Sequence, residues 1–162
     1  MPSNAHWLAV ADQLVSSRVF EVDDAPFIRT LSEAATAELR HDRGGVMPFD
    51  VDRPLLAARD ERAGNSALVV VGLIDDVVVG FARCQIFTVG SRRVASVDDL
   101  FVHPAARGVG VGASMLGLIR AWAGENDCSH LESQVLPGNR EAKNFFERMG
   151  MVTRRMQVST EL

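Results

Sequence analysis

Three glycines alternate with valines in the segment Arg107-Gly-Val-Gly-Val-Gly112, which constrains the fold more than any other feature. The preceding residues 92–102 predict a strand, and an apolar stretch reaching about Gly124 predicts a helix. Glycines expose backbone N–H groups, and at a helix N-terminus these groups and the helix dipole favour phosphate oxygens. The segment therefore predicts a phosphate-binding turn. The alternative is a tight strand-to-helix turn that needs glycine only for its backbone.

The kind of phosphate ligand follows from what surrounds the turn. No Lys-Ser/Thr pair follows the last glycine, so the turn is not a Walker A loop. Gly108, Gly110 and Ala113 do fit the dinucleotide fingerprint G-x-G-x-x-A. The turn lies in the second half of the chain, however, and Glu132 falls within the next strand rather than at its end. A Rossmann-like nucleotide binder stays as the least favoured alternative.

Hydrophobic patterning gives the order of elements. Strands are predicted over residues 14–22, 67–74, 77–87, 92–102, 129–136 and 151–159, with a hairpin turn at Asp75-Asp76. Helices are predicted from an Asp cap at 23–24 to Gly44-Gly45, over 52–63, from the glycine turn to Gly124, and over 140–149. This order predicts an α/β fold with a mixed, mostly antiparallel central sheet and helices on both faces. We expect a single domain over residues 1–162, with residues 1–13 as an N-terminal extension.

Composition excludes several classes of protein. The chain has 162 residues, 47% of them hydrophobic, with 17 basic and 21 acidic side chains. Such a chain can build one core and is poorly suited to nucleic acid. No apolar stretch approaches the about 20 residues of a membrane span, and no export signal opens the chain, so we expect a cytoplasmic protein. Cys84 and Cys128 are isolated, which predicts no metal site.

Two segments carry a family resemblance that runs from about Arg18 to Val158. Val97-Asp-Asp-Leu-Phe-Val-His-Pro-Ala-Ala-Arg-Gly-Val-Gly-Val-Gly112 resembles the acetyl-CoA motif of the GCN5-related N-acetyltransferase (GNAT) superfamily. Asn139-Arg-Glu-Ala-Lys-Asn-Phe-Phe-Glu-Arg-Met-Gly150 is similar to the family's Asn-x-x-Ala-x-x-Phe-Tyr-x-x-x-Gly helix. The resemblance implies a GNAT-like fold. It also implies direct transfer of an acetyl group, in a ternary complex, from acetyl-CoA to a primary amine of a small molecule or peptide.

The resemblance also implies roles for matching positions. Backbone amides of the glycine turn would hold the coenzyme A pyrophosphate. The end of the preceding strand would pair with the pantetheine arm, and one of its amides would polarise the thioester carbonyl. The helix at 140–149 would complete the cofactor site. The cofactor-binding residues are then Leu100, Phe101, Val102, Arg107, Gly108, Val109, Gly110, Val111, Gly112, Ala113, Asn139, Ala142 and Phe145.

Acyl transfer needs the neutral amine, whose ammonium form has a pKa of about 10.4, so a base or a desolvating site must help at neutral pH. Asp98 is the first candidate, because a similar acidic pair in the family's polyamine-acetylating branch places an acid there. Asp99 is the second candidate and Glu132 the third. Strand alternation predicts that Asp98 and Asp99 point to opposite faces. At least one of these acids is expected to be a solvated or ion-paired strand residue.

The family's proton-donating tyrosine is replaced by Phe146, and the whole chain contains no tyrosine. We expect Phe146 to be a core residue. Three interpretations follow: the thiolate leaves unaided or through water, Ser133 or Cys84 donates the proton, or the protein binds acyl-CoA with little turnover as a sensor or partner-binding module. Residues 23–64 are expected to shape the acceptor site. Their mixed charges select no substrate class, and the last strand is compatible with a homodimer.

Overall fold

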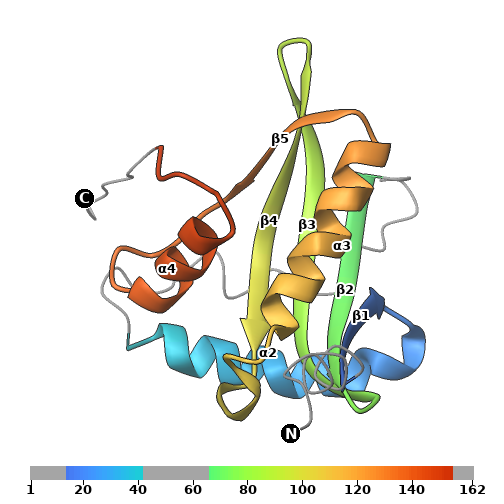
Figure 1. Ribbon diagram of the computed structural model, residues 1–162, viewed down its shortest axis with the longest axis vertical. Helices are drawn as coiled ribbons and strands as arrows, with labels where there is room; N and C mark the ends of the chain where they lie inside the picture. Colours follow the sequence, from blue (N-terminus) through green and yellow to red (C-terminus); the bar gives the residue numbers. More distant parts are fainter. Residues whose placement is uncertain (1–13, 42–65, 155–162) are drawn as a thin grey trace, which may run out of the picture.

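The computed structural model describes residues 14–41 and 66–154, and all that follows concerns these residues (Figure 1). The chain forms β1 (Val15–Val19), the 3-10 turn η1 (Val22–Asp24), α2 (Ala25–Leu39), β2 (Ala67–Ile74), β3 (Val77–Val89), β4 (Arg92–Val102), the 3-10 turn η5 (Pro104–Ala106), α3 (Val111–Glu125), β5 (Cys128–Ser133) and α4 (Arg140–Arg148).

The strands form one sheet in the order β1-β2-β3-β4-β5. The pairs β1–β2, β2–β3 and β3–β4 are antiparallel, and the pair β4–β5 is parallel. This confirms the predicted mixed, mostly antiparallel sheet. The predicted hairpin is also confirmed. Asp75 and Asp76, between β2 and β3, have φ angles of 47° and 63°, and two positive φ angles are what a type I′ turn requires.

Helices cover both faces of the sheet, as predicted. Alternate residues of the strands, such as Val70 and Val97, pack in a core that contains the buried residues of α3. The intervening positions, such as Val71 and Phe101, pack in a second core with Ile28 and Leu31 of α2. We refer to these as the α3 face and the α2 face. α4 lies beside the end of β4 (Figure 1), and its Phe146 joins the core of the α3 face.

The predicted start of the chain's first helix is confirmed, although the aspartate cap makes no side-chain hydrogen bond to the helix. Asp24 is the N-cap residue of α2, with Pro26 in the first turn, but its carboxylate does not bond to that helix. It accepts the backbone N–H of Glu21 at 2.8 Å and two bonds from the Arg18 guanidinium at 2.7 and 2.9 Å. These bonds favour the 3-10 turn η1. The strand predicted over 14–22 therefore ends at Val19.

Other boundaries also differ from the prediction, and the strand predicted over 77–87 extends to Val89. α2 ends at Leu39, before the predicted stop at Gly44-Gly45, which lies outside the described residues. The strand predicted over 129–136 ends at Ser133, before Pro137. In the predicted strand 151–159, residues 151–154 form no strand, and the remainder lies outside the described residues. The extension 1–13 and the helix predicted over 52–63 also lie outside them. Among the described helices, none has the length and apolar character needed to span a bilayer.

Candidate active site

The glycine turn has the backbone that the sequence predicts. Gly108 and Gly110 have φ angles of 80° and 103°, in the left-handed region that favours glycine. Gly110 is the N-cap of α3, and the first α-helical bond runs from the Ser114 N–H to its carbonyl at 2.9 Å. The amides of Val111, Gly112 and Ala113 therefore have no acceptor within the helix. A helix N-terminus with exposed glycines before it suits an anion.

The side chain of Arg107, at the start of the turn, is bound by other parts of the protein. Its Nε donates to the carbonyl of Val102 at 2.9 Å. One terminal nitrogen pairs with Glu38 of α2 at 2.8 Å and the other with Glu141 of α4 at 3.0 Å. The guanidinium also lies 5.4 Å from the centre of the Phe101 ring. Hydrogen bonding to Glu38 raises the pKa of Arg107 further. The backbone of the turn, rather than this side chain, is the part presented to an anion.

β4 and β5 separate before the chain reaches this turn. Their pairing runs from Arg93 to Val97 on β4, and the Ser133 hydroxyl donates to the Val97 carbonyl at 3.0 Å where it ends. Within the described residues, the later part of β4, up to Val102, pairs only with β3. Its other edge can receive an extended chain as an added strand. This places the predicted cofactor segment, Leu100 to Val102, on the open edge of β4.

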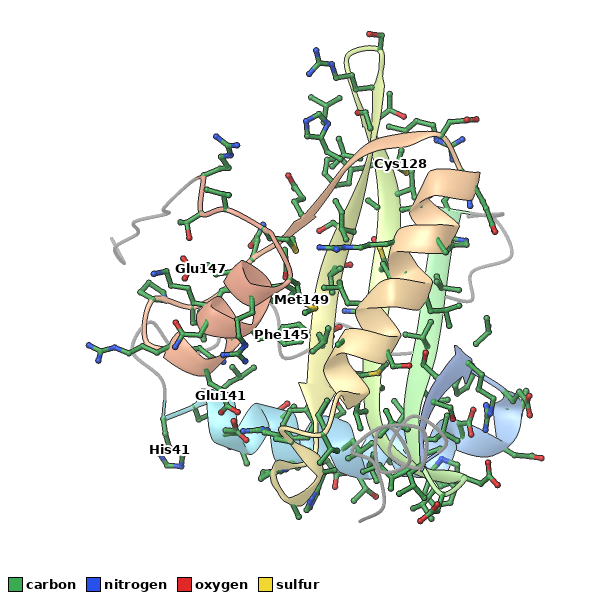
Figure 2. All side chains as sticks on the ribbon, in the orientation of Figure 1. His41, Cys128, Glu141, Phe145, Glu147 and Met149 are labelled. Carbon is green, nitrogen blue, oxygen red and sulfur yellow. The ribbon has the colours of Figure 1, made fainter. Side chains whose placement is uncertain are left out.

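α4 closes the other side of this opening. The Asn139 side-chain oxygen accepts the N–H of Ala142 at 2.9 Å and so caps α4. Phe145 points from α4 toward the start of α3 (Figure 2). A Cβ atom on Gly112 would lie 3.1 Å from the Phe145 ring, so glycine there permits close packing of the two helices. Phe146 is 8% exposed and lies in the core, as predicted.

The two candidate acids on β4 sit at a β-bulge. Arg83 of β3 is opposite Asp99 and Cys84 is opposite Val97, so Asp98 is the extra residue. Asp98 accepts a hydrogen bond from Ser96 at 3.1 Å, and Asp99 lies 2.6 Å from Arg83. Ser96 and Arg83 each stand between two residues of the α3-face core, so both belong to the α2 face. The expectation that the acids point to opposite faces is therefore wrong, because a bulge resets the alternation.

Glu132 of β5 belongs to the same face. It is level with Ser96 on the neighbouring parallel strand, and Leu131 beside it packs against the core of the α3 face. The structure thus brings all three predicted acids, Asp98, Asp99 and Glu132, to one face of the sheet. Asp99 is held by Arg83, whereas Glu132 is exposed. Asp98 lies between them, directly before the open edge of β4.

The two residues named as substitute proton donors are placed differently. The Ser133 hydroxyl donates to the Val97 carbonyl. Cys84 is fully buried, and burial, followed by the nearby charge of Asp98, raises the pKa of its thiol to about 12. Such a thiol holds its proton at neutral pH and is a poor proton donor. Among the described residues, no cluster of His, Cys, Asp or Glu side chains could hold a metal ion.

Some residues around the site could have been found from the sequence and others could not. Arg83 is a charged residue inside an apolar strand, a pattern that points to a buried ion pair. Glu38 was only one charge among many in the acceptor region. Nothing local connects Glu141 with Arg107, because the two are 34 positions apart in the sequence.

Comparison with known proteins agrees with this geometry. Residues 30–151 match the model of the acetyltransferase (GNAT) family. The chain is 35% identical over 88 residues to the uncharacterized N-acetyltransferase YhfO of Bacillus subtilis, a match that covers 53% of this chain and 59% of that relative. It is 30% identical over 118 residues to aminoglycoside N(6')-acetyltransferase type 1 of Stenotrophomonas maltophilia, covering 69% of this chain and 76% of that one.

Solved structures share the fold at low identity. A tetramutant of the BH1408 protein from Bacillus halodurans has a TM-score of 0.73 at 19% identity, over 90% of this chain and 99% of that one. The aminoglycoside N-acetyltransferase AAC(6')-Iy, solved with CoA, has a TM-score of 0.69 at 19% identity, over 91% and 94%. An aminoglycoside acetyltransferase from an uncultured soil metagenomic sample, solved with sisomicin, has a TM-score of 0.67 at 16% identity. The match covers 93% of this chain and 97% of that one. The chain belongs to the GNAT acetyltransferase family.

Proposed function

We propose that the chain is an acetyl-CoA-dependent N-acetyltransferase that acts on a primary amine by direct transfer in a ternary complex. One observation carries the proposal: the glycine turn at the start of α3 follows a stretch of β4, residues 98–102, that lies beyond the pairing with β5 among the described residues. The turn suits a pyrophosphate, the edge suits an extended arm, and the acid suits an amine. These three features fit acetyl-CoA, which when bound supplies the acetyl thioester.

The residues of the turn, of β4 and of α4 would each bind a different part of the cofactor. The amides from Gly108 to Ala113 would hold phosphate oxygens, and the backbone of Leu100 to Val102 would bind and orient the pantetheine arm. A backbone N–H in that segment would stabilise negative charge on the reacting carbonyl oxygen. Phe145 lies against Gly112 and would pack against the arm, together with Ala142. The Asn139 oxygen caps α4, so its part in the site would be to position that helix or to donate through its NH₂ group.

Asp98 is proposed as the base. It would accept a proton from the acceptor's ammonium group, which leaves the amine free to attack. Its hydrogen bond from Ser96 orients the carboxylate, and Asp99 is occupied by Arg83. Glu132 on the same face would attract a second positive charge of the acceptor. Asp98 and Glu132 together favour cationic acceptors, and the aminoglycoside N(6')-acetyltransferase relative makes aminoglycosides the first class to test.

No side chain is assigned as the acid that protonates the departing thiolate. A thiol pKa near 8.5 makes coenzyme A a tolerable leaving group without one. The absence of tyrosine from the chain favours the alternative function, which is an acyl-CoA sensor or partner-binding module with little turnover. Cytoplasmic location and homodimerisation stay predictions from the sequence.

Release of free thiol from acetyl-CoA tests the proposal across a panel of aminoglycosides, other amines, amino acids and peptides. We expect turnover with at least one cationic amine, and a large fall in kcat for Asp98→Asn. Calorimetry with CoA and with NAD should show binding of CoA only. CoA binding without turnover on any amine would favour the sensor, and NAD binding without CoA binding would favour a Rossmann-like protein.

A further inference from the structure

Two buried glycines, Gly72 of β2 and Gly80 of β3, are opposite each other in the sheet and lie beneath the start of α3. A Cβ atom on Gly72 would lie 2.5 Å from Cγ1 of Val111 and 3.0 Å from Sδ of Met115. A Cβ atom on Gly80 would lie 3.1 Å from Cε of Met115. Glycine inside a strand weakens the strand and often marks a close approach of another segment. This pair lets α3 lie closer to the sheet than residues with a Cβ atom would permit.

Val111 connects the glycine pair to the phosphate-binding turn. It is the first residue of α3, and its backbone amide is one of those without an acceptor inside the helix. Its side chain is 1% exposed and points into the core of the α3 face. Because Cγ1 of Val111 is the atom nearest to the missing Cβ of Gly72, the absence of that Cβ sets how deeply the turn lies on the sheet.

A β-bulge next to the glycine pair holds the other end of the same loop. The register shifts directly after Gly72, which leaves Val79 as the extra residue of β3. The Val79 carbonyl accepts the N–H of His103, the first residue after β4, at 2.8 Å. The loop that carries the turn is therefore attached to one place in the sheet at both ends, at His103 through the bulge and at Val111 through Gly72.

Gly80 also contacts the stretch of β4 that is proposed to bind the pantetheine arm. It is opposite Val102 in the pairing of β3 with β4. Its Cβ atom would lie 2.8 Å from the Phe101 carbonyl oxygen and 3.2 Å from Cγ2 of Val102. The glycine pair thus touches both parts of the proposed cofactor site, the turn through Gly72 and the strand through Gly80.

We propose that Gly72 and Gly80 are positioning residues for the cofactor site: they hold the amides of the glycine turn at the distance from β4 that one CoA molecule spans. The proposal rests on the proposed function, in which the turn binds the pyrophosphate and β4 binds the pantetheine arm. The two parts of the ligand are covalently joined, so the phosphates cannot follow a displaced turn while the arm stays on β4. A displacement of about 1 Å takes a hydrogen bond of ordinary length out of range.

Gly72→Ala tests this, because its Cβ atom must displace Val111. We expect the Kd for CoA, measured by calorimetry, to rise about ten- to a hundredfold, the effect of losing about one hydrogen bond to a charged group. Binding of pantetheine, which has the arm but no pyrophosphate, should change by less than about twofold. Gly80→Ala should weaken both ligands, because Gly80 touches β4. A glycine needed only for folding would not distinguish CoA from pantetheine.

Val111→Ala provides a rescue, because it removes the Cγ1 atom that the new Cβ would meet. The thioether of Met115 is flexible and can adjust to the second contact. We expect Gly72→Ala combined with Val111→Ala to bind CoA within about threefold of Val111→Ala alone. The control is Gly124→Ala, near the exposed end of α3, whose Cβ would meet no atom within 4 Å. It should change the affinity for neither ligand.

The outcomes separate this inference from the proposed function. Unchanged CoA affinity in Gly72→Ala, an equal loss for CoA and pantetheine, or no rescue by Val111→Ala would overturn the role of the glycine pair even if the wild type acetylates an amine. If Gly72→Ala does not fold, recovery of folding and CoA binding in the double variant supports the inference, and failure to recover overturns it. A wild type that binds CoA but acetylates no amine would overturn the proposed function, and the calorimetric comparison would still decide the role of the glycines.

Discussion

The guanidinium of Arg107 lies 2.8 Å from the carboxylate of Glu38, and this ion pair joins the glycine turn to the end of α2. The same guanidinium binds Glu141, which lies on the side of α4 nearest to α2 in Figure 2. Three segments far apart in the sequence thus meet at one side chain. One of them carries the proposed pyrophosphate site, one lies in the region expected to shape the acceptor site, and one closes the cofactor site.

Glu38→Gln is expected to weaken CoA binding several-fold, because Arg107 would hold the turn less firmly. The cost in folding free energy should be no more than about 1 kcal/mol, since the Glu38 side chain is 40% exposed and solvent screens the pair. Calorimetric titration with CoA measures the first effect and urea unfolding the second. Lys143→Gln, which breaks the exposed pair with Glu147 on α4, is the matched control. Equal CoA affinity in both variants would contradict a role of the Arg107–Glu38 pair in holding the turn.

Gly110→Ala should damage the turn, because φ at this position is 103° and a Cβ atom makes that conformation strained. We expect a loss of about 1–3 kcal/mol in folding free energy and a clear loss of CoA affinity. Gly117→Ala in α3 is the control: it is exposed, inside the helix, and its Cβ would meet no atom within 4 Å. That change should stabilise the protein by about 0.5–1 kcal/mol. Wild-type CoA affinity in Gly110→Ala would exclude the turn as the phosphate site.

Features set by adjacent residues could be predicted from the sequence, whereas contacts between residues distant in the sequence could not. Alternating glycines predicted the turn, and two aspartates between valine-rich runs predicted the hairpin, because backbone conformation there depends on adjacent residues. Strand alternation failed at Asp98 and Asp99, because a bulge depends on what stands opposite in another strand. The partners of Arg107 were likewise beyond prediction, since they come from two distant helices. The family resemblance supplied roles for the cofactor residues, but it could not show that Arg83 forms an ion pair with Asp99.

Asp24 makes stability depend on pH in the acid range. The carboxylate is buried, and its hydrogen bonds from Arg18 lower its pKa below the ordinary 3.8. A group whose pKa is lowered by folding stabilises the protein above its unfolded pKa, and this stability is lost as the pH falls through the folded pKa. Asp24→Asn should therefore lower Tm by several degrees at pH 7, and the difference should shrink below about pH 4. A difference in Tm that stays constant down to pH 2 would contradict this account.

Cys84 should be chemically inert in the native protein. Its side chain is fully buried and its thiol pKa is raised to about 12, so the reactive thiolate is scarce at neutral pH. Iodoacetamide at pH 8 followed by mass spectrometry should label Cys128, which is partly exposed, and leave Cys84 unlabelled until the protein unfolds. Because folding raises this pKa from 9.0, the unfolded state loses the proton first, and stability should decline as the pH rises above about 9.

Cys84→Ala should cost about 1 kcal/mol in stability and change kcat by less than about twofold. A larger fall in kcat with unchanged CoA affinity would return Cys84 to consideration as the proton donor.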